Sequence, residues 1–455
     1  MNTADGAARR RKAGGRPFAV SGSSAPGAAA PGERTGEPTG ATEEAGLAWR
    51  RTELANGVRV VSEAVPGARS LSVGVWIGVG SRDEPPERAG LCHVLEHLIF
   101  KGTADRDARS LAVAFDAVGG EMNAYTAKER TAYYSRVPAG AEDIGLDLLL
   151  EAVTQAELRA EDLDQEREVI LEELAGAEDD PGDWADTKLF EVLFADHPLG
   201  REVIGSVESV GSITRQDVVD FVAGHHGGAN VVVSAAGVVD HDRLVDGVQR
   251  WLHTVPSSTP SGRVAPTNAA GGRIHVRRRT EQTQLALGWR CGGLHSPDRY
   301  ALTVLEHVLG DGPASRLFFE VREQRALAYS VGSALALYSD VGTLLVSTAV
   351  APERALETKR VIEGEVARVA ADGITSDELV ATVGYVVGST LIGLEEASTC
   401  MARLGYLELT YGTVTPVEAY LDKIRAVTLQ DVQRVAASTF AAAPAQATVG
   451  PRSVR

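Results

Sequence analysis

The chain has 455 residues, 44% of them hydrophobic, and carries a formal net charge of −17. This length supports about two to four domains with buried cores. The excess of acidic side chains argues against a nucleic-acid-binding protein, because phosphate backbones attract basic surfaces. The three cysteines lie far apart, at positions 92, 291 and 400. They indicate no disulfide framework, so we expect a reducing compartment, the cytoplasm.

The N-terminal stretch is rich in Gly, Ala, Pro, Ser and Thr. It cannot bury enough apolar surface to offset the entropy of ordering, so residues 1–46 are predicted to be a disordered tail. The basic run 9–12 is not followed by an apolar segment, which argues against a secretory signal; a mitochondrial presequence is the alternative. The most apolar stretch, 383–394, contains glycines and is too short to span a bilayer. We therefore expect a core helix there and no membrane partner.

Turn signals and hydrophobic periodicity divide the first half of the chain into strands and helices. Order is expected to begin near Trp49, and Asn56-Gly57 predicts a hairpin turn within residues 52–61. Alternating apolar residues predict a strand over 70–80, and a charged, proline-containing loop follows over 81–88. The same signals predict a later strand over 230–237 and helices over 107–118, 139–155, 160–176, 183–194, 214–225 and 240–252.

A histidine motif follows that loop, in a stretch that we expect to be helical. His93 and His97 are four positions apart, so a helix presents both imidazoles on one face, close enough to hold one metal ion. Glu96 lies beside that face. Two imidazoles suit Zn²⁺, and an adjacent carboxylate can accept a proton from a water that the metal activates. The order H-x-x-E-H is the inverted form of the commoner zinc-protease helix motif.

A zinc site of this kind needs a third protein ligand, and an acidic helix supplies the candidates. Glu166 and Glu173 lie seven positions apart, on one face of the helix predicted over 160–176. Two carboxylates on one face suggest a metal ligand and a partner that orients a histidine or the water. Glu168 and Glu172 compete with Glu173 for the ligand position, and an acidic run is usually a solvated helix face.

The motif His93-x-x-Glu96-His97, followed 76 positions later by Glu173, resembles the pitrilysin/insulinase family of zinc metallopeptidases, peptidase family M16. The resemblance covers about residues 51–449. The length resembles the shorter branch, which includes the β subunit of mitochondrial processing peptidase and many bacterial peptidases. The resemblance implies one Zn²⁺ per chain, held by His93, His97 and Glu173. It also implies Glu96 as the general base and Glu166 as the supporting acid.

A second matching pattern concerns the substrate. In the family, a strand with the pattern Asn-Ala-Tyr/Phe-Thr forms the sheet edge beside the zinc, and a substrate peptide adds to that edge as an extra strand. Asn123 and Ala124 match this pattern. Binding of this kind uses main-chain hydrogen bonds and therefore tolerates many sequences. An ordinary hairpin is the alternative interpretation of the same residues.

The second half of the chain echoes the first. Residues 254–272 are rich in Pro, Ser and Gly and are predicted to be a linker between a zinc-bearing half, 47–253, and a homologous half, 273–455. The motif at 93–97 has a counterpart at 303–307, 210 positions later, and the helix start at 214–218 has one at 428–432, 214 positions later. Two nearly equal offsets indicate a duplication.

The second copy lacks ligands and is not expected to bind zinc. Thr303 stands where the first histidine stands, and the position 76 residues after His307 is Val383. By resemblance, Arg322 and Tyr329 match an Arg and a Tyr, seven apart, that reach across a chamber to the substrate and its oxyanion. A surface arginine and a packed strand tyrosine are the alternative.

Three features complicate these matches. Arg325 is the neighbouring competitor of Arg322, Ala326 stands where the family often has glycine, and Cys92 precedes the first histidine where a small residue is usual.

Taken together, these matches imply an α+β fold of two homologous halves, each a mainly antiparallel sheet with helices packed on one face. By family analogy, the halves enclose a chamber like a clamshell, as in mitochondrial processing peptidase. The implied function is a zinc metalloendopeptidase that hydrolyses unfolded peptides or small proteins and acts as a homodimer. The alternatives are a presequence-processing subunit that needs a partner and a catalytically silent structural subunit of the same fold.

Overall fold

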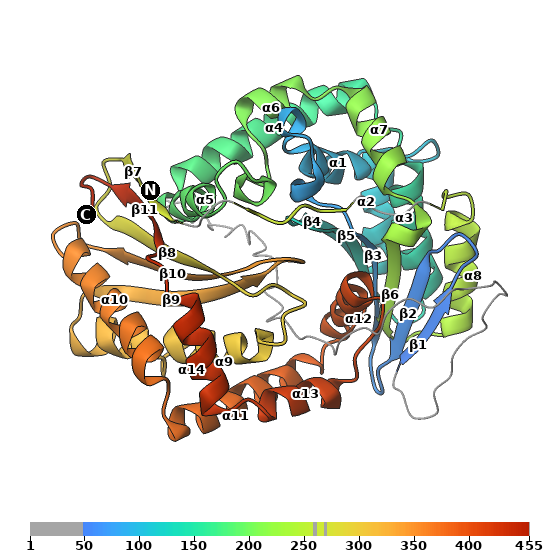
Figure 1. The fold of residues 1–455 in the computed structure, drawn as a ribbon. Helices are drawn as coiled ribbons and strands as arrows, with labels where there is room; N and C mark the ends of the chain where they lie inside the picture. The colour runs from blue at the N-terminus through green and yellow to red at the C-terminus, as the bar shows by residue number, and fades with distance from the viewer. Residues whose placement is uncertain (1–48, 258–261, 268–270, 455) are drawn as a thin grey trace, which may run out of the picture.

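The structure is a computed structural model that describes residues 49–257, 262–267 and 271–454. The predicted N-terminal tail lies outside the described residues, as does part of the predicted linker. Two sheets, one in each half of the chain, lie side by side with their helices around them (Figure 1). The first sheet runs through residues 49–237 and the second through residues 272–450.

The first half alternates strands and helices close to the predicted bounds. The predicted hairpin at Asn56-Gly57 forms, and Gly57 takes the left-handed conformation (φ 89°) that such a turn favours. The strand order is β1-β2-β6-β3-β5-β4, and β2–β6 is its only parallel pair. The elements are β1 (Trp49–Glu53), β2 (Arg59–Ala64), β3 (Ser70–Ile77), α1 (Leu91–Ile99), α2 (Ala108–Val118), β4 (Glu121–Thr126), β5 (Thr131–Pro138), α3 (Glu142–Gln155), α4 (Ala160–Asp179), α5 (Pro181–Leu193), α6 (Val207–Ser212), α7 (Arg215–His225), β6 (Val231–Gly237) and α8 (His241–Leu252).

The second half repeats this arrangement without a counterpart of β1. Its strand order is β7-β11-β8-β10-β9, and again one pair, β7–β11, is parallel. The predicted α+β fold of two homologous, mainly antiparallel halves is therefore confirmed. The elements are β7 (Gly272–Arg277), β8 (Thr283–Cys291), α9 (Arg299–Gly310), β9 (Ala328–Leu337), β10 (Gly342–Val350), α10 (Ala355–Asp372), α11 (Ser376–Gly393), α12 (Ala397–Tyr411), α13 (Val417–Arg425), α14 (Leu429–Thr439) and β11 (Ala445–Gly450).

The duplication is also visible in the helix starts. Thr214 caps α7 by accepting a hydrogen bond from the Asp217 N–H, and Thr428 caps α14 by accepting one from the Asp431 N–H, both at 3.2 Å. In each case the aspartate carboxylate accepts the threonine N–H in return. Such a capping box satisfies two backbone donors that the helix itself leaves free. The echo between 214–218 and 428–432 is therefore one local structure that occurs in both halves.

The two halves exchange one helix each. Figure 1 shows α12 against the first sheet, although it belongs to the second half, and α5 against the second sheet, although it belongs to the first. Each sheet thus has helices of its own half on one face, as predicted, and a single exchanged helix on the other. Gly405 makes the close approach of α12 possible, because a Cβ there would lie 2.0 Å from the indole nitrogen of Trp76 on β3.

Buried charge accompanies this exchange. Glu408 on α12 is completely buried, and its carboxylate lies 3.1 Å from Nε of Arg51 on β1 and 3.6 Å from Nη1 of Arg59 on β2. The Glu408 carbonyl also accepts a hydrogen bond from Arg59 at 2.9 Å. Burial raises the pKa of Glu408, against the opposing effect of the two guanidinium groups. This cluster joins the two halves at a place shielded from water.

One prediction about α11 is wrong in part. The apolar stretch 383–394 is helical to Gly393, as predicted, but it was also expected to lie in the core, and Tyr385, Leu391 and Ile392 are 55%, 48% and 68% exposed. The helix packs on α9 and α13 through one face, so many of its hydrophobic side chains stay exposed. Among the described residues, no single helix is long and apolar enough to span a bilayer; only α11 and α12 taken together meet that test, and they are bent by 108°.

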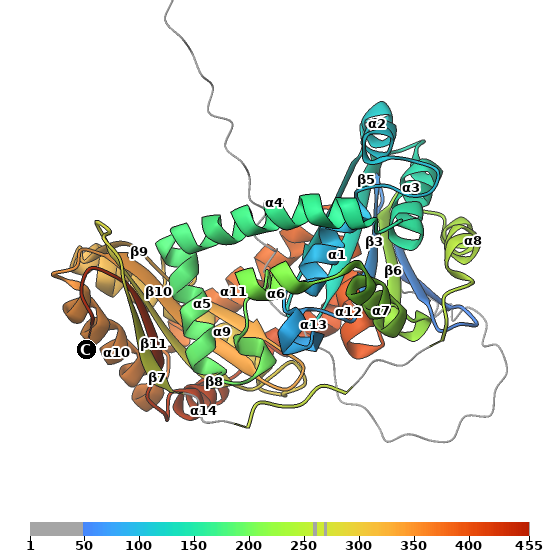
Figure 2. The ribbon, with the colours of Figure 1, turned by 90° about the horizontal axis from the view of Figure 1, so that it is seen from above.

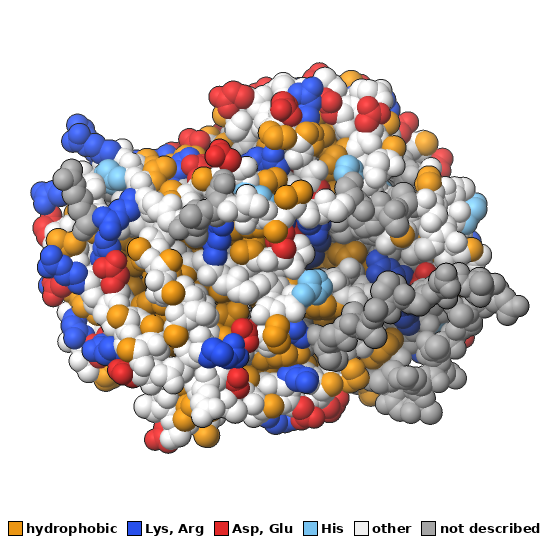
Figure 3. Space-filling view, viewed as in Figure 1, with side chains coloured by type: hydrophobic (Ala, Val, Ile, Leu, Met, Phe, Trp, Pro, Cys, Tyr) orange, Lys and Arg blue, Asp and Glu red, His pale blue; other side chains and the backbone are white. Residues whose placement is uncertain are grey.

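Figure 3 shows how charged side chains are arranged on one face of the molecule. On the face shown in Figure 3, acidic and basic side chains are interspersed with uncharged and hydrophobic ones. The net charge of −17 is therefore not gathered into one acidic patch on this face.

We predict that Glu408→Ala destabilises the chain by about 3 kcal/mol, because it leaves two arginines at a shielded contact without their carboxylate. Denaturant unfolding measures this difference, with Glu395→Ala, at an exposed position just before α12, as the matched control. Equal unfolding midpoints for the two variants would contradict the assigned role of the cluster.

Candidate metal centre

The helix α1 presents the histidine motif because its other face is apolar. Its buried residues are Leu91, Cys92, Val94, Leu95, Leu98 and Ile99, which join the main core of the first half. His93, Glu96 and His97 occupy the remaining face, where they are only partly exposed. The amphipathic pattern of nine residues thus fixes which side chains face the site.

The acidic helix α4 lies against α1, as Figure 2 shows. Leu163, Ile170 and Leu174 of α4 are buried on the core side. This burial directs Glu166 into the contact between the helices, where it is 6% exposed, and leaves Glu173 at the border of the contact with its side chain 45% exposed. Glu168 and Glu172 lie on the exposed face of the same helix.

Three of the predicted residues converge. Oε2 of Glu173 lies 3.8 Å from Nε2 of His93 and 3.5 Å from Nε2 of His97. Tetrahedral ligands about 2.0–2.2 Å from a zinc ion are separated by similar distances. Among the residues that the structure describes, these three form the one group of ligand atoms within 4.8 Å of one another. The donor set of two imidazoles and a carboxylate fits Zn²⁺, and neither Glu168 nor Glu172 belongs to it.

The neighbours of the two histidines keep both rings suited to metal binding. Nδ1 of His97 lies 2.8 Å from Oε2 of Glu166, and the other oxygen of Glu166 pairs with Lys101. Burial opposes ionisation of Glu166, but the hydrogen bonds from Lys101 and His97 outweigh it and hold the pKa of Glu166 below its ordinary value. Burial, aided by the charge of His97, lowers the pKa of His93 to about 4. The His93 ring is therefore neutral at physiological pH, with a lone pair to donate.

Glu96 lies beside the ligand group without belonging to it. Its Oε2 accepts a hydrogen bond of 2.6 Å from Oγ1 of Thr126 at the end of β4. Burial raises the pKa of Glu96, and the Thr126 hydroxyl works against that rise. A partly desolvated carboxylate, oriented by one hydroxyl, has the character of a general base.

The predicted peptide-binding strand is an edge strand. β4 is the last strand of the first sheet and pairs only with β5, so its other side has unpaired main-chain groups. Asn123 and Ala124 lie on this strand, and the Asn123 side chain accepts a hydrogen bond from the Ala124 N–H at 2.8 Å. Because Thr126 lies on the same strand, the edge and the base Glu96 are directly connected.

Arg322 and Tyr329 lie side by side in the second half of the chain. The Arg322 guanidinium is 4.8 Å from the Tyr329 ring centre, and Tyr329 is 78% exposed at the start of β9, the edge strand of the second sheet. In the described part of the chain, no hydrogen bond or ion pair joins either residue to the ligand group. Arg325 pairs with Glu320 instead. Ala326 has a positive φ of 47°, a conformation that glycine adopts more easily than other residues, so this position favours glycine.

Sequence reasoning missed three polar residues of the site. Lys101 supports Glu166, Thr126 supports Glu96, and Glu84 bonds the start of α1. Thr126 lies inside the matched strand pattern and could have been found there. Glu84 lies in a stretch that the sequence describes only as a charged loop, and nothing in its spacing marks it.

Comparisons with known proteins agree with this geometry. The family model described as "Insulinase (Peptidase family M16)" matches residues 59–207, and that described as "Peptidase M16 inactive domain" matches residues 212–383. The chain belongs to peptidase family M16. The second match includes most of the half that lacks the histidine pair.

Relatives of this M16 chain extend over nearly its whole length. An uncharacterized zinc protease of Mycobacterium tuberculosis (strain ATCC 25618 / H37Rv) is 44% identical over 416 residues, which cover 90% of this chain and 94% of the relative. The uncharacterized zinc protease YmxG of Bacillus subtilis (strain 168) is 33% identical over 402 residues, covering 88% and 98%.

Solved structures share the fold at lower identity. A protease from Helicobacter pylori superimposes with a TM-score of 0.82 at 22% identity and covers 89% of this chain and 99% of that one. A peptidase M16 inactive domain from Pseudomonas fluorescens gives a TM-score of 0.83 at 19% identity, covering 90% and 99%.

We predict that Glu166→Gln weakens zinc binding by about 10-fold or more, because His97 loses the negatively charged partner that orients its ring. Competition with a chromophoric chelator measures the affinity. Glu168→Gln, on the exposed face of the same helix, is the control and is expected to bind zinc as the wild type does. Equal affinities for the two variants would show that Glu166 does not support the metal centre.

Proposed function

We propose that this M16 protein is a zinc-dependent endopeptidase in which His93, His97 and Glu173 hold the metal and Glu96 is the general base. The observation that carries the proposal is the convergence of two Nε2 atoms and one carboxylate oxygen, with a second carboxylate, that of Glu96, oriented separately beside them. A structural metal site needs no such base, whereas peptide hydrolysis needs a group that accepts and returns a proton. The relatives named as zinc proteases support the same assignment.

The chemistry divides between the metal and the chain's own residues. When bound, zinc supplies Lewis acidity, which polarises a carbonyl and makes a water more acidic. Glu96 takes the proton from the attacking water and delivers it to the leaving amine. Thr126 holds one oxygen of Glu96, so the other oxygen is left for the proton. Glu166 keeps His97 in one orientation through its Nδ1.

Substrates are proposed to be unfolded peptides or small proteins. The support is the free edge of β4. A substrate peptide in an extended conformation can pair with this edge as one more strand of the sheet, beside Asn123 and Ala124. A folded protein cannot present an extended segment to such an edge, and a chamber formed by the halves would exclude it. We place this activity in the cytoplasm, with no nucleic acid or membrane as partner.

We further propose a homodimer in which the partner subunit's Tyr329 and Arg322 complete the site. The support is their position: both lie in the second half, Tyr329 is largely exposed, and among the described residues neither has a hydrogen bond or ion pair with the ligand group of its own chain. A phenol or guanidinium directed at the developing oxyanion would stabilise the tetrahedral intermediate. The Arg322–Tyr329 contact positions the two groups together for this role.

The first test is cleavage of unstructured peptides by the purified chain beside Glu96→Gln, with products identified by mass spectrometry. We expect cleavage by the wild type, its loss with a zinc chelator, and a loss of at least about 100-fold in the variant, since a positioned base contributes that much or more. Both proteins should bind zinc alike, because Glu96 is not a ligand.

Other outcomes identify the alternatives. Failure of a zinc-loaded wild type to cut any peptide would favour a processing subunit that needs a different partner. Failure to cut together with failure to bind zinc would favour a silent structural subunit. Unchanged cleavage by Glu96→Gln would remove Glu96 from the mechanism.

A complementation experiment tests the two-subunit site. Glu96→Gln and Tyr329→Phe chains with different tags are co-expressed, and molecules that carry both tags are isolated. Each heterodimer has one intact site of two, so we expect about half of the wild-type activity, although each variant alone is nearly inactive. An inactive heterodimer would place Tyr329 in the site of its own chain, and failure to isolate doubly tagged molecules would exclude the homodimer.

A further inference from the structure

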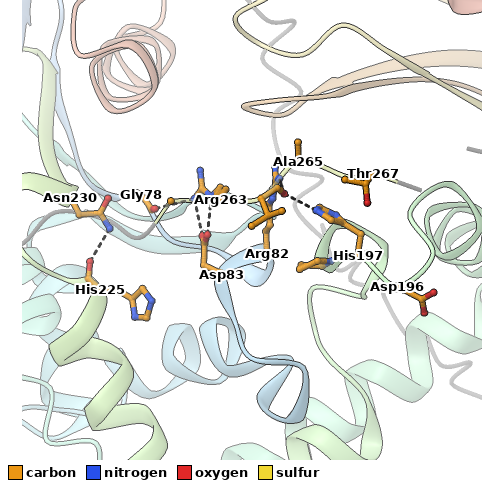
Figure 4. Close-up of a pocket in the computed structure, with 13 residues that line it drawn as sticks. Gly78, Arg82, Asp83, Asp196, His197, His225, Asn230, Arg263, Ala265 and Thr267 are labelled. Carbon is orange, nitrogen blue, oxygen red and sulfur yellow. Dashed lines mark hydrogen bonds and ion pairs between the residues drawn. The ribbon is translucent and has the colours of Figure 1, made fainter. Parts of the chain in front are cut away.

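The connection between β3 and α1, residues 78–90, is unusually rich in bonded charges. Each of three consecutive residues in it has partners of its own. Arg82 pairs with Glu129 and with Asp340 in the turn between β9 and β10. Asp83 pairs with Arg263 of the predicted linker, which Figure 4 shows facing it beside a pocket. Glu84 is turned in another direction, toward the start of α1.

The Glu84 carboxylate closes the N-terminal end of α1. Its Oε2 accepts a hydrogen bond from the Gly90 N–H at 2.8 Å, and its Oε1 accepts one from the Cys92 N–H at 2.7 Å. The first N–H groups of a helix have no partner within the helix and must find one elsewhere. Gly90, the residue that precedes α1, has no side chain to serve as a cap and has a φ of 93°. Glu84 does what a capping side chain would otherwise do.

This carboxylate is held in place and shielded from solvent. Glu84 is 4% exposed, and Arg201 donates hydrogen bonds to its backbone carbonyl and to that of Ser81. The connection is further fixed by the Arg82 N–H, which bonds the Lys128 carbonyl at 2.8 Å. A buried carboxylate with two backbone donors cannot be replaced by water without rearrangement, so the orientation of the first turn of α1 depends on it.

We propose that Glu84 is a positioning residue for the metal centre: by bonding the backbone on both sides of Leu91, it sets the rotation of the first turn of α1 and thereby the direction of His93. This inference rests on the proposed zinc site. His93 directly follows Cys92, so a change in the first turn moves its imidazole relative to His97 and Glu173. The later turns of α1 are held by their own core packing, so His97 moves less. Glu84 therefore controls the separation between the ligands.

The test compares Glu84→Gln with Glu87→Gln, a change of the same kind at an exposed position in the same connection. Glutamine keeps the length of Glu84 but turns an NH₂ group toward one of the two backbone donors. We expect zinc affinity to fall about tenfold, the effect typical of residues behind metal ligands, while circular dichroism and the unfolding temperature show a folded protein. In the cobalt-substituted proteins, the visible absorption bands, which report ligand geometry, should shift for Glu84→Gln only.

Peptidase activity is a further measurement on the same variants. With peptides as substrates, kcat should fall with KM little changed, because the β4 edge is untouched. The zinc titration and the cobalt spectrum do not require cleavage, so a protein that binds metal but cuts nothing would overturn the proposal that this chain cuts peptides without a different partner and leave this inference standing. Wild-type affinity and an unshifted spectrum in Glu84→Gln would overturn this inference alone.

If Glu84→Gln does not fold, hydrogen exchange in the wild-type protein decides. The Gly90 and Cys92 amides should exchange slowly, as bonded buried amides do. Exchange as fast as at an exposed amide would show that the carboxylate does not hold the helix start. Slow exchange at both would support the proposal.

Discussion

The contact between α1 and α4 is the constraint on which the metal centre depends. Neither helix carries a complete ligand set, because α1 supplies two imidazoles and α4 supplies the carboxylate, 76 positions later in the chain. The two helices meet through apolar residues, and His97 and Glu166 face one another within that contact, whereas Glu173 lies at its border. The His97–Glu166 bond lies inside the contact and fixes the register between the helices. The packing of α1 against α4 therefore also determines the geometry of the ligands.

The exchanged helices give the two halves a similar dependence on each other. Each sheet has one face that its own half leaves uncovered, and α12 or α5 covers it from the other half. An interface of this kind cannot open without exposing core residues such as Trp76. The Glu408 cluster adds a charged contact that is satisfied only when α12 is in place. The two halves are thus homologous, but they pack together as one unit.

Sequence predicted the elements that depend on local pattern. The amphipathic period of α1 placed His93 and His97 on one face, and the capping residues placed the starts of α7 and α14 correctly. The same reasoning left three glutamates of α4 in competition, because period alone cannot tell a border position from an exposed one. Packing against α1 decided between them in favour of Glu173.

What the sequence could not predict depends on contacts between distant segments. Apolar composition suggested that α11 is buried, yet burial requires a neighbour on each face, and only the fold determines that. The exchange of α5 and α12 leaves no local pattern, since an exchanged helix and a helix packed on its own sheet have the same amphipathic face. Glu84 looks like any acidic loop residue until the backbone donors that it bonds are known.

Comparison with the second half distinguishes the features of the candidate site that belong to the fold from the residues that would bind the metal. Ser333 on β9 donates a hydrogen bond of 3.0 Å to the Glu306 carboxylate on α9, just as Thr126 on β4 does to Glu96 on α1. Burial raises the pKa of Glu306 to about 8, so this carboxyl is largely protonated at neutral pH. A buried carboxyl still needs a hydrogen-bond partner, so the pair is favoured even where it has no base to orient. The helix and the edge strand are thus common to both halves, and in each a hydroxyl of that strand bonds the glutamate of the helix, although Thr126 ends β4 and Ser333 lies within β9. The chemistry requires a histidine where the second half has Thr303 and a glutamate where it has Val383, and the first half has His93 and Glu173 at these positions.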